Sequence, residues 1–364
     1  MENKLKIGTL NCRGLNNLEK ILYLDDLLRI NGIDICFLQE THLSTDLGLR
    51  NLEENLKSYN VFSNLSIDKS KGVAILVKSK LQVENFTFVD DRYIALDLVI
   101  NKKVYNLVNI YAPNLISEQV RYIEVLDNKI FDKKNLILGG DFNCVDNSVL
   151  DRTGSYHTHA TLKLNQKLWR EFYKLHKISE IKYLHSDKKE MTWSNGTQAS
   201  RIDRFYIKNI ISNDMQYHSN VYCQYSDHKL VISELNFGNL HKIKKHTNSY
   251  NDTWKLNESV LDDEYVNQQI IEICKNISSL KVISQDGWYE LFIGKITKLL
   301  KRESRRISKQ KKERINFLFE KLNTLIRSSS ESTEIIEIEK EIDLFYKEKR
   351  KGIELRACSV KDIF

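Results

Sequence analysis

Polar residues with chemically useful side chains follow or precede short apolar runs at five points in the first two thirds of the chain. Carboxylates, amides, a tyrosine and a histidine can together bind a hard cation and handle protons. The ends of strands are where a rigid sheet directs polar groups into a cleft. We therefore expect five clusters to meet in one cleft: Asn11, Gln39–His42, Tyr111–Asn114, Asp141–Asn143 and Ser226–His228.

Each of these residues, taken alone, also has an ordinary structural interpretation. Glu40 is of a type that usually stays solvated, and a single His228 is more often structural than catalytic. Asn143 suits a turn, and Tyr111 suits a core position with a satisfied hydroxyl. Asp203 lies between two arginines and suits a local ion pair. The order and spacing of the whole set therefore carry the functional interpretation.

The elements that would position these residues alternate along the first 237 residues. Helical spacing of apolar residues predicts helices over Ile21–Ile30 and Val120–Ile130. Many short strands with a few helices indicate an α/β (α+β) domain with mixed sheets. The predicted strands are Leu5–Leu10, Ile33–Leu38, Val73–Val77, Tyr93–Ile100, Val104–Tyr111, Leu136–Leu138, Arg201–Ile207 and Lys229–Leu235.

The chain changes character after residue 237, which divides it into a domain over 1–237 and a helical region over 238–364. His241–His246 is polar and basic and suits a linker. Amphipathic spacing predicts helices over Trp288–Leu299, Ile315–Leu325 and Ile335–Phe345. We expect the last two to form an antiparallel hairpin, with Ser332 or Thr333 near the N-cap of the second.

Charge and composition limit the partners and the compartment. The 364 residues carry a formal charge of +7, and residues 301–314 alone hold eight basic and two acidic residues, a net charge of +6. This basic segment suits a solvated helix face, a contact with RNA or DNA, or a nuclear-import signal. The chain shows no signal peptide and no membrane-length apolar run, and its cysteines suit buried thiols. We expect an intracellular, nuclear protein.

Six segments of the first domain resemble the endonuclease/exonuclease/phosphatase superfamily, whose members are DNase I-like, and they occur in that family's order. The resemblance covers about residues 5–237 and implies a four-layer αββα sandwich of two mixed sheets. The matching segments are LNCRGL (Leu10–Leu15), FLQETH (Phe37–His42), NIYAPN (Asn109–Asn114), LGGDFN (Leu138–Asn143), SRIDRFYI (Ser200–Ile207) and YSDHKLV (Tyr225–Val231).

A finer resemblance is to the apurinic-like endonuclease domain of LINE-type, non-LTR retrotransposons. It is carried by the motifs at Asn11–Gly14, Gln39–His42, Asp151-Arg152 and Thr192–Ser194. In such polyproteins a helical connecting region, which residues 238–364 resemble, leads to a reverse transcriptase. No reverse transcriptase follows here, so we expect a fragment, a truncated copy or a product with the endonuclease alone.

The resemblance implies a divalent-metal-dependent enzyme that nicks DNA. Glu40 would be the primary ligand of Mg²⁺, with Mn²⁺ as an alternative, beside Asn11, and Asp227 would serve a second metal position. Asp141, assisted by Asn143, would orient or deprotonate the attacking water. His228 paired with Asp203 would place positive charge against the phosphate. Tyr111 and Asn114 would contact phosphate or the leaving group.

DNA contacts are expected mainly at the phosphate backbone. The candidates are Asn114, Arg152, Thr192, Asn195, Ser200, Arg201 and Ser226. Arg152 and Arg201 equally suit ion pairs with carboxylates of the domain. Three other functions stay open: repair of abasic sites, another phosphodiesterase or phosphatase activity of the same fold, and a catalytically silent nucleic-acid-binding remnant. The complete set of candidate catalytic residues argues against the silent remnant.

Overall fold

The computed structural model describes residues 4–63, 65–68, 70–153, 160–181, 190–208, 215–236, 258–279, 285–328 and 333–361. The chain divides into two compact units, Met1–His246 and Thr247–Phe364. The predicted linker His241–His246, the predicted boundary after residue 237 and Ser332 lie outside the described residues. Across the ranges given above, none of the helices combines the length and the apolar character needed to cross a membrane.

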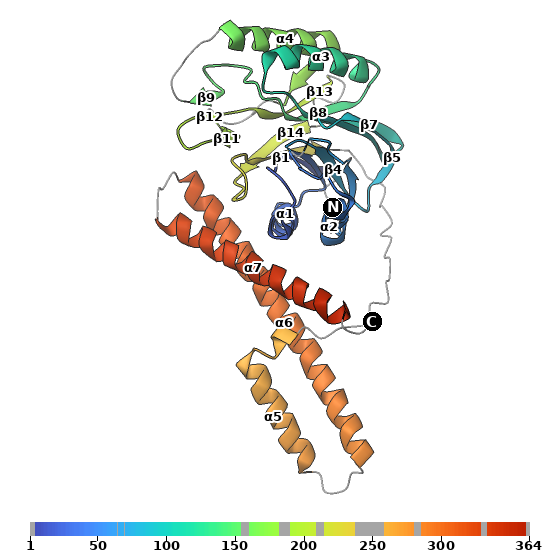
Figure 1. Ribbon diagram of the computed structural model, residues 1–364, viewed down its shortest axis with the longest axis vertical. Coiled ribbons are helices and arrows are strands. Elements are labelled where there is room, and N and C mark those ends of the chain that lie inside the picture. The colour runs from blue at the N-terminus through green and yellow to red at the C-terminus, as the bar shows by residue number, and fades with distance from the viewer. Residues whose placement is uncertain are drawn as a thin grey trace. The chain divides into compact units, whose positions relative to one another are not determined.

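Two six-stranded mixed sheets form the centre of the first unit (Figure 1). The first sheet has the order β14 (Met215–Val221), β15 (Leu230–Asn236), β1 (Lys4–Asn11), β2 (Ile35–Gln39), β4 (Val73–Lys78) and β3 (Tyr59–Ser63). The second has the order β10 (Ile178–Glu180), β13 (Asp203–Lys208), β8 (Leu136–Asp141), β7 (Lys103–Tyr111), β6 (Tyr93–Ile100) and β5 (Gln82–Asp90). Only β1–β2 and β7–β8 pair in parallel; the other neighbours are antiparallel.

The inner faces of the two sheets pack against each other in one apolar core. Ile7 and Phe37 from the first sheet and Ile137 and Phe205 from the second belong to the same buried cluster. The rings of Phe37 and Phe205 lie 5.7 Å apart, centre to centre, across the two sheets. Burial on both faces, by the opposite sheet and by the outer helices, explains why the central strands are nearly continuous apolar runs.

Helices cover the outer face of each sheet. Helices α3 (Ile116–Ile130) and α4 (Ala160–His176) lie over the second sheet, where Leu126 and Trp169 join its buried outer face. Helices α1 (Leu18–Ile30) and α2 (Asp46–Asn55) lie on the side of the first sheet (Figure 1). The predicted four-layer αββα sandwich is therefore confirmed.

A small third sheet lies near one end of the sandwich. It has the order β11 (Trp193–Ser194), β12 (Ala199–Ser200) and β9 (Arg152–Thr153). An isolated bridge joins Trp193 to His228, so this sheet is tied to the loop before β15. The sequence patterns did not predict these two-residue strands, and they also missed α2, α4, β3, β5, β10 and β14.

The second unit is helical, with a short 3-10 turn, η2 (Glu258–Val260), followed by α5 (Glu264–Ser278), α6 (Gln285–Arg327) and α7 (Thr333–Lys361). Two helices predicted over Trp288–Leu299 and Ile315–Leu325 are one helix of 43 residues, α6, which corrects that prediction. The segment between them is rich in lysine and arginine, which favour helix, and has no proline or glycine.

The predicted antiparallel hairpin joins α6 and α7. Arg314 lies 2.6 Å from Glu341, and Lys321 lies 2.6 Å from Glu334. The partner number rises along α7 as the number falls along α6, which is the register of antiparallel helices. The apolar residues between these ion pairs are buried, among them Leu318 and Ile338.

Candidate active site

Strand register brings the predicted residues to one end of the two sheets. In the second sheet, Asp141 at the end of β8 pairs with Tyr111 on one side and with Asp203 on the other. In the first sheet, Asn11 at the end of β1 pairs with Gln39, the residue before Glu40. These ends meet because parallel strands place their carboxyl ends at the same edge of a sheet.

The side chain of Asn11 joins the two sheets. Its Nδ2 atom donates to Glu40 Oε1 at 2.8 Å and to Asp141 Oδ2 at 3.0 Å. The hydroxyl of Tyr111 donates to the same Glu40 oxygen at 2.9 Å. Asn11 is fully buried, so its two donor hydrogens orient both carboxylates without competition from water.

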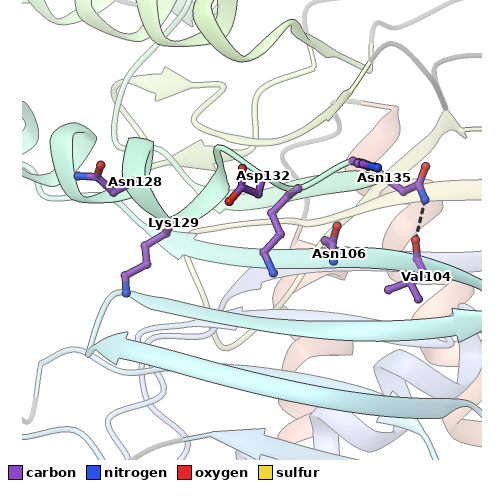
Figure 2. A pocket seen from close by; sticks show the side chains of 8 residues that line it. Val104, Asn106, Asn128, Lys129, Asp132 and Asn135 are labelled. Carbon is purple, nitrogen blue, oxygen red and sulfur yellow. Dashed lines mark hydrogen bonds between the residues drawn. The ribbon is translucent and has the colours of Figure 1, made fainter.

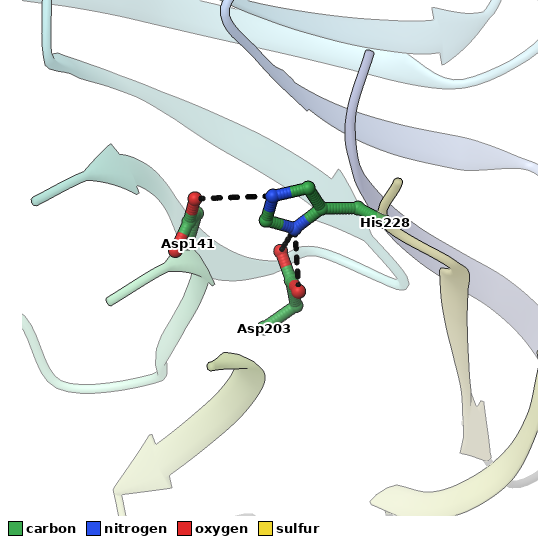
Figure 3. Close-up of side chains that lie close together, drawn as sticks. All are labelled: Asp141, Asp203 and His228. Atoms are coloured by element: carbon green, nitrogen blue, oxygen red, sulfur yellow. Dashed lines mark hydrogen bonds and ion pairs between the residues drawn. The ribbon is translucent and has the colours of Figure 1, made fainter. Parts of the chain in front are cut away.

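His228 and Asp203 form a buried pair beside Asp141 (Figure 3). His228 Nδ1 lies 2.9 Å from Asp203 Oδ2, and His228 Nε2 lies 4.0 Å from Asp141 Oδ2. Burial lowers the pKa of His228, but the charge and hydrogen bond of Asp203 outweigh it and raise that pKa to about 9. The ring is therefore an imidazolium at neutral pH.

The pKa of Asp141 is higher than that of an ordinary aspartate. Burial, followed by repulsion from Asp203, raises the pKa of Asp141, and His228 and the Asn11 hydrogen bond only partly oppose this. Burial and the charge of Glu40 raise the pKa of Tyr111, so its phenol stays neutral and can act as a donor.

Backbone strain is concentrated at the same residues. Glu40 has φ 51° and Asn143 has φ 47°, and Arg13 and His42 are also in the left-handed region. This conformation is unfavourable for residues other than glycine and persists where the surrounding structure imposes it. In this conformation the backbone N–H of Asn143 donates to Asp141 Oδ1 at 2.9 Å. Its side-chain Nδ2 donates to the Ala112 carbonyl at 2.8 Å.

These residues line a pocket of about 300 Å³. Its walls are formed by Glu40, Asn114, Asp141, Asn143, Trp193, Ser200, Ile202, Asp227 and His228. Seven of these nine were predicted from the sequence; Trp193 and Ile202 were not. Trp193 belongs to the motif Thr192–Ser194, which carries part of the retrotransposon resemblance, and its place in that motif could have identified it as a pocket residue.

Asp227 is fixed by two residues that the sequence interpretation did not select. Trp193 Nε1 donates to Asp227 Oδ2 at 2.9 Å, and Arg13 Nη1 lies 3.1 Å from the same oxygen. The hydroxyl of Ser226 donates to the Asn11 carbonyl and accepts from the backbone N–H of His228, so it holds these two residues in place. Ser226 is thus a positioning residue.

Besides Ser226, two of the proposed DNA contacts are engaged inside the protein. Thr192 is fully buried, and its hydroxyl accepts from the N–H groups of Ile202 and Asp203 at 3.1 Å each. Arg201 Nε lies 2.8 Å from Asp151, and the guanidinium also pairs with Glu180. The structure therefore corrects the interpretation of Thr192 as a surface contact and favours the ion-pair alternative for Arg201.

The remaining proposed DNA contacts lie at or near the surface. Asn195 is exposed in the turn between β11 and β12, where its side-chain oxygen accepts from the N–H of Gln198 at 2.8 Å. Arg152 is half-buried and donates to Gln198 at 3.4 Å. Ser200 and Asn114 face the pocket itself.

The donor set of the pocket fits a hard divalent cation. Glu40, Asp141 and Asp227 bring carboxylates to its wall. Among the described residues no donor is within hydrogen-bond distance of the buried Oδ1 atom of Asp227, and His228 Nε2 lies 3.9 Å from it. Asp141, Asp203 and His228 also lie within metal-binding distance of one another. Oxygen atoms predominate on the side of Glu40, and oxygen ligands are those that a hard cation prefers.

A separate hollow of about 440 Å³ lies at the opposite end of β7, beside the end of α3 (Figure 2). It is lined by Val104, Asn106, Asn128, Lys129, Asp132, Lys133, Lys134 and Asn135. Asn135 Nδ2 donates to the Val104 carbonyl at 2.7 Å, which anchors the loop before β8. We interpret this hollow as a structural feature of the β7–α3 edge.

The chain belongs to the Endonuclease/Exonuclease/phosphatase family, which matches residues 8–228, more than half of its length. The protein is thus a member of a hydrolase family, and the match includes every residue of the pocket.

One curated relative is similar to the chain in sequence. It is 28% identical over 279 residues to the Transposon TX1 uncharacterized 149 kDa protein of Xenopus laevis. That alignment covers 71% of this chain but only 20% of the relative, so the chain spans about a fifth of that protein.

Two solved structures share the fold of the first unit. An AP endonuclease from Archaeoglobus fulgidus has a TM-score of 0.54 and 16% identity, over 63% of this chain and 98% of that protein. A 3'-5' exonuclease from Neisseria meningitidis has a TM-score of 0.50 and 19% identity, over 64% of this chain and 100% of that protein. At these identities they show the fold alone, and they confirm the DNase I-like architecture.

Proposed function

We propose that this protein is a divalent-metal-dependent endonuclease that nicks DNA and is encoded by a transposable element. The observation that carries the proposal is the hydrogen bonding of Asn11 to both Glu40 and Asp141, with the His228–Asp203 pair beside them in one pocket. The likeness to the transposon TX1 protein supports the link to a transposable element.

Asp141 would accept the proton of the attacking water at its carboxylate. Its raised pKa makes it a stronger base than a solvated aspartate, and a base works best when its pKa is near the working pH. The N–H of Asn143 and the amide of Asn11 hold its two oxygens, which fixes the plane of the carboxylate. A pre-aligned base of this kind lowers the entropic part of the barrier.

His228 would place its Nε2–H and its positive charge against the phosphate oxygens. Asp203 orients the ring through Nδ1 and keeps it protonated. A fixed imidazolium stabilises negative charge as it develops in the transition state. The neutral hydroxyl of Tyr111 supplies a further donor at the same site.

Glu40 and Asn11 would hold the cation, and Asp227 would contribute to a second position. Mg²⁺ suits these oxygen ligands, with Mn²⁺ as the alternative. When bound, such a cation neutralises charge on the phosphate and stabilises the leaving oxygen. Tyr111 and Asn11 donate to Glu40 and so keep its carboxylate in place.

DNA would meet the pocket through its backbone. Asn114 and Ser200 on the pocket wall and Arg152 and Asn195 on the small third sheet remain the candidate contacts. Backbone contacts of this kind position the duplex and carry little sequence information.

Conversion of supercoiled plasmid to open circles tests the proposal. The purified protein with Mg²⁺ should nick the plasmid, and chelation or the substitutions Asp141→Ala and His228→Ala should abolish nicking. An abasic duplex, an inositol polyphosphate and sphingomyelin serve as competing substrates. Hydrolysis of one of these orders of magnitude faster than nicking would replace the proposed substrate. Absence of nicking by folded protein with every divalent metal tried would favour a silent binding module.

A further inference from the structure

A stripe of basic side chains runs along one face of α6, in the helical unit. It consists of Lys298, Arg302, Arg305, Lys309 and Lys312, which are spaced by four, three, four and three residues. This spacing places all five side chains on one side of a helix. All five are exposed, and at a rise of about 1.5 Å per residue the stripe is roughly 21 Å long.

One carboxylate meets the stripe, at Arg302. Between Lys298 and Lys312, the only acidic residue is Glu303, which is buried and accepts from Arg302 Nε at 2.6 Å and from Arg306 Nε. Glu313, one residue further on, lies 3.8 Å from Lys309, and both of these side chains are largely exposed. Exposed ion pairs of this kind are weak and are easily exchanged for another anion.

The opposite face of α6 is already covered. Leu300 packs in a buried cluster with Val260 and Val266, and Ile296 and Ile307 pack against that cluster. A helix that lies on a membrane needs a free apolar face beside its basic one. Because α5 and η2 occupy that face, the stripe suits a water-exposed polyanion better than a lipid surface.

The stripe residues themselves include no aromatic side chain on which unpaired bases could stack, and Tyr265, which shares a hollow with Arg302, has the guanidinium of Arg306 over its ring at 5.6 Å. Proteins that hold single strands combine basic residues with such aromatic platforms. A straight row of flexible cations on a rigid helix instead matches the regular phosphates of a duplex.

We propose that the stripe Lys298–Arg302–Arg305–Lys309–Lys312 on α6 binds the phosphodiester backbone of a nucleic-acid duplex, at a site separate from the hydrolytic pocket. The stripe recognises the charge and the spacing of the phosphates and does not distinguish base sequences. It does not depend on the hydrolytic activity, so binding and nicking can be measured independently.

The test is fluorescence anisotropy of the full chain in EDTA, where nicking cannot occur, with a 20-base-pair DNA duplex, the matched RNA duplex and a single strand. The variant Lys298→Gln/Arg305→Gln/Lys312→Gln removes three stripe charges with a residue that favours helix. The matched control Lys311→Gln/Lys340→Gln/Lys347→Gln removes three exposed charges of the same unit away from the stripe.

The stripe variant should bind a duplex roughly tenfold more weakly or worse, and its slope of log K against log salt should fall by about 0.9 for each lost contact. The control should retain both the affinity and the slope. DNA and RNA arms show which duplex is bound more tightly, and tight binding of either supports the site.

Equal losses in the two variants would mean a general charge effect and would overturn the proposal. An unchanged slope in the stripe variant, or a preference for the single strand, would also overturn it, as would tighter binding to vesicles containing phosphatidylserine. Nicking by the wild type together with an unchanged slope would remove the stripe proposal and leave the nuclease. A smaller salt slope in the stripe variant, together with no nicking by the wild type, would support the stripe and remove the proposed nuclease.

Discussion

At the scale of single residues, the site contains ionisable groups whose pKa values are shifted by burial and by neighbouring charges. Asp141 is only 1% exposed and faces Asp203 across the β8–β13 pairing. His228 relieves part of that repulsion, and Asn11 donates to the carboxylate. Groups poised in this way favour proton transfer, and they reduce the stability of the fold.

Asp141→Asn should therefore separate activity from stability. Nicking should fall by about 100-fold or more, because the general base is lost. The melting temperature in EDTA at pH 8 should rise, since ionisation of the buried carboxylate is disfavoured in the folded state. Asp132→Asn, an exposed control, should change neither quantity appreciably. A lower melting temperature for Asp141→Asn would contradict the charge argument.

His228 predicts a pH dependence of stability. Its pKa is raised from 6.5 to about 9 in the folded state, so its contribution is complete below pH 6.5 and is lost as the pH rises through 9. Urea unfolding in EDTA should show wild type more stable than His228→Gln at pH 6, by on the order of 3 kcal/mol. The difference should shrink toward pH 10. A difference that is constant over this range would refute the linkage.

At the scale of elements, β8 shows how a strand places a side chain, that of Asp141, in the pocket. Two glycines precede Asp141, and each fits where a side chain could not. A Cβ on Gly139 would lie 2.5 Å from the Phe205 ring, and one on Gly140 would overlap the carbonyl of Ile110. Gly140 also has φ 139°, which other residues rarely adopt. The close approach of β7, β8 and β13 at Asp141 depends on both.

Gly140→Ala should destabilise the first unit by roughly 3 kcal/mol or more, through the clash and the backbone strain. It should also lower nicking, because Asp141 is displaced. Gly294→Ala is the matched control: it lies on α6 with open space around it, so it should stabilise that helix by up to about 1 kcal/mol. Chemical denaturation of both variants measures the two effects, and similar changes in both would count against this account of β8.

At the scale of the whole molecule, the two units carry different chemistry. The first unit holds the pocket with its carboxylates, and the second holds residues 301–314, whose net charge of +6 accounts for most of the formal +7. A cation that binds only the folded pocket stabilises the first unit by mass action.

Addition of Mg²⁺ at ten times its Kd should stabilise the protein by about 1.4 kcal/mol. Glu40→Gln should remove this stabilisation, because the primary ligand loses its charge. Glu53→Gln on α2 makes the same chemical change at an exposed position and should keep the full shift. Scanning calorimetry with and without Mg²⁺ provides the measurement. A Mg²⁺ shift retained in Glu40→Gln would move the cation away from Glu40.

The sequence patterns predicted an α/β (α+β) domain with mixed sheets, most of its longer strands and the polar clusters at their ends, and the family resemblance implied the four-layer sandwich. Apolar periodicity and turn residues act locally, so they can be read along the chain. The same patterns missed α4 and divided α6 at its basic stretch. A solvated basic helix and a loop between two helices both lack regularly spaced apolar residues, so an apolar pattern cannot distinguish them.

Tertiary structure alone decided the contacts that the polar residues make with one another. The pairing of Asp141 with Asp203, the bridge from Asn11 to both Glu40 and Asp141, and the enclosure of Arg201 by Asp151 and Glu180 all join residues far apart in the chain. Such contacts depend on strand register and burial, which no local pattern encodes. For that reason Arg201 and Thr192 looked like DNA contacts in sequence and are internal supports in the fold.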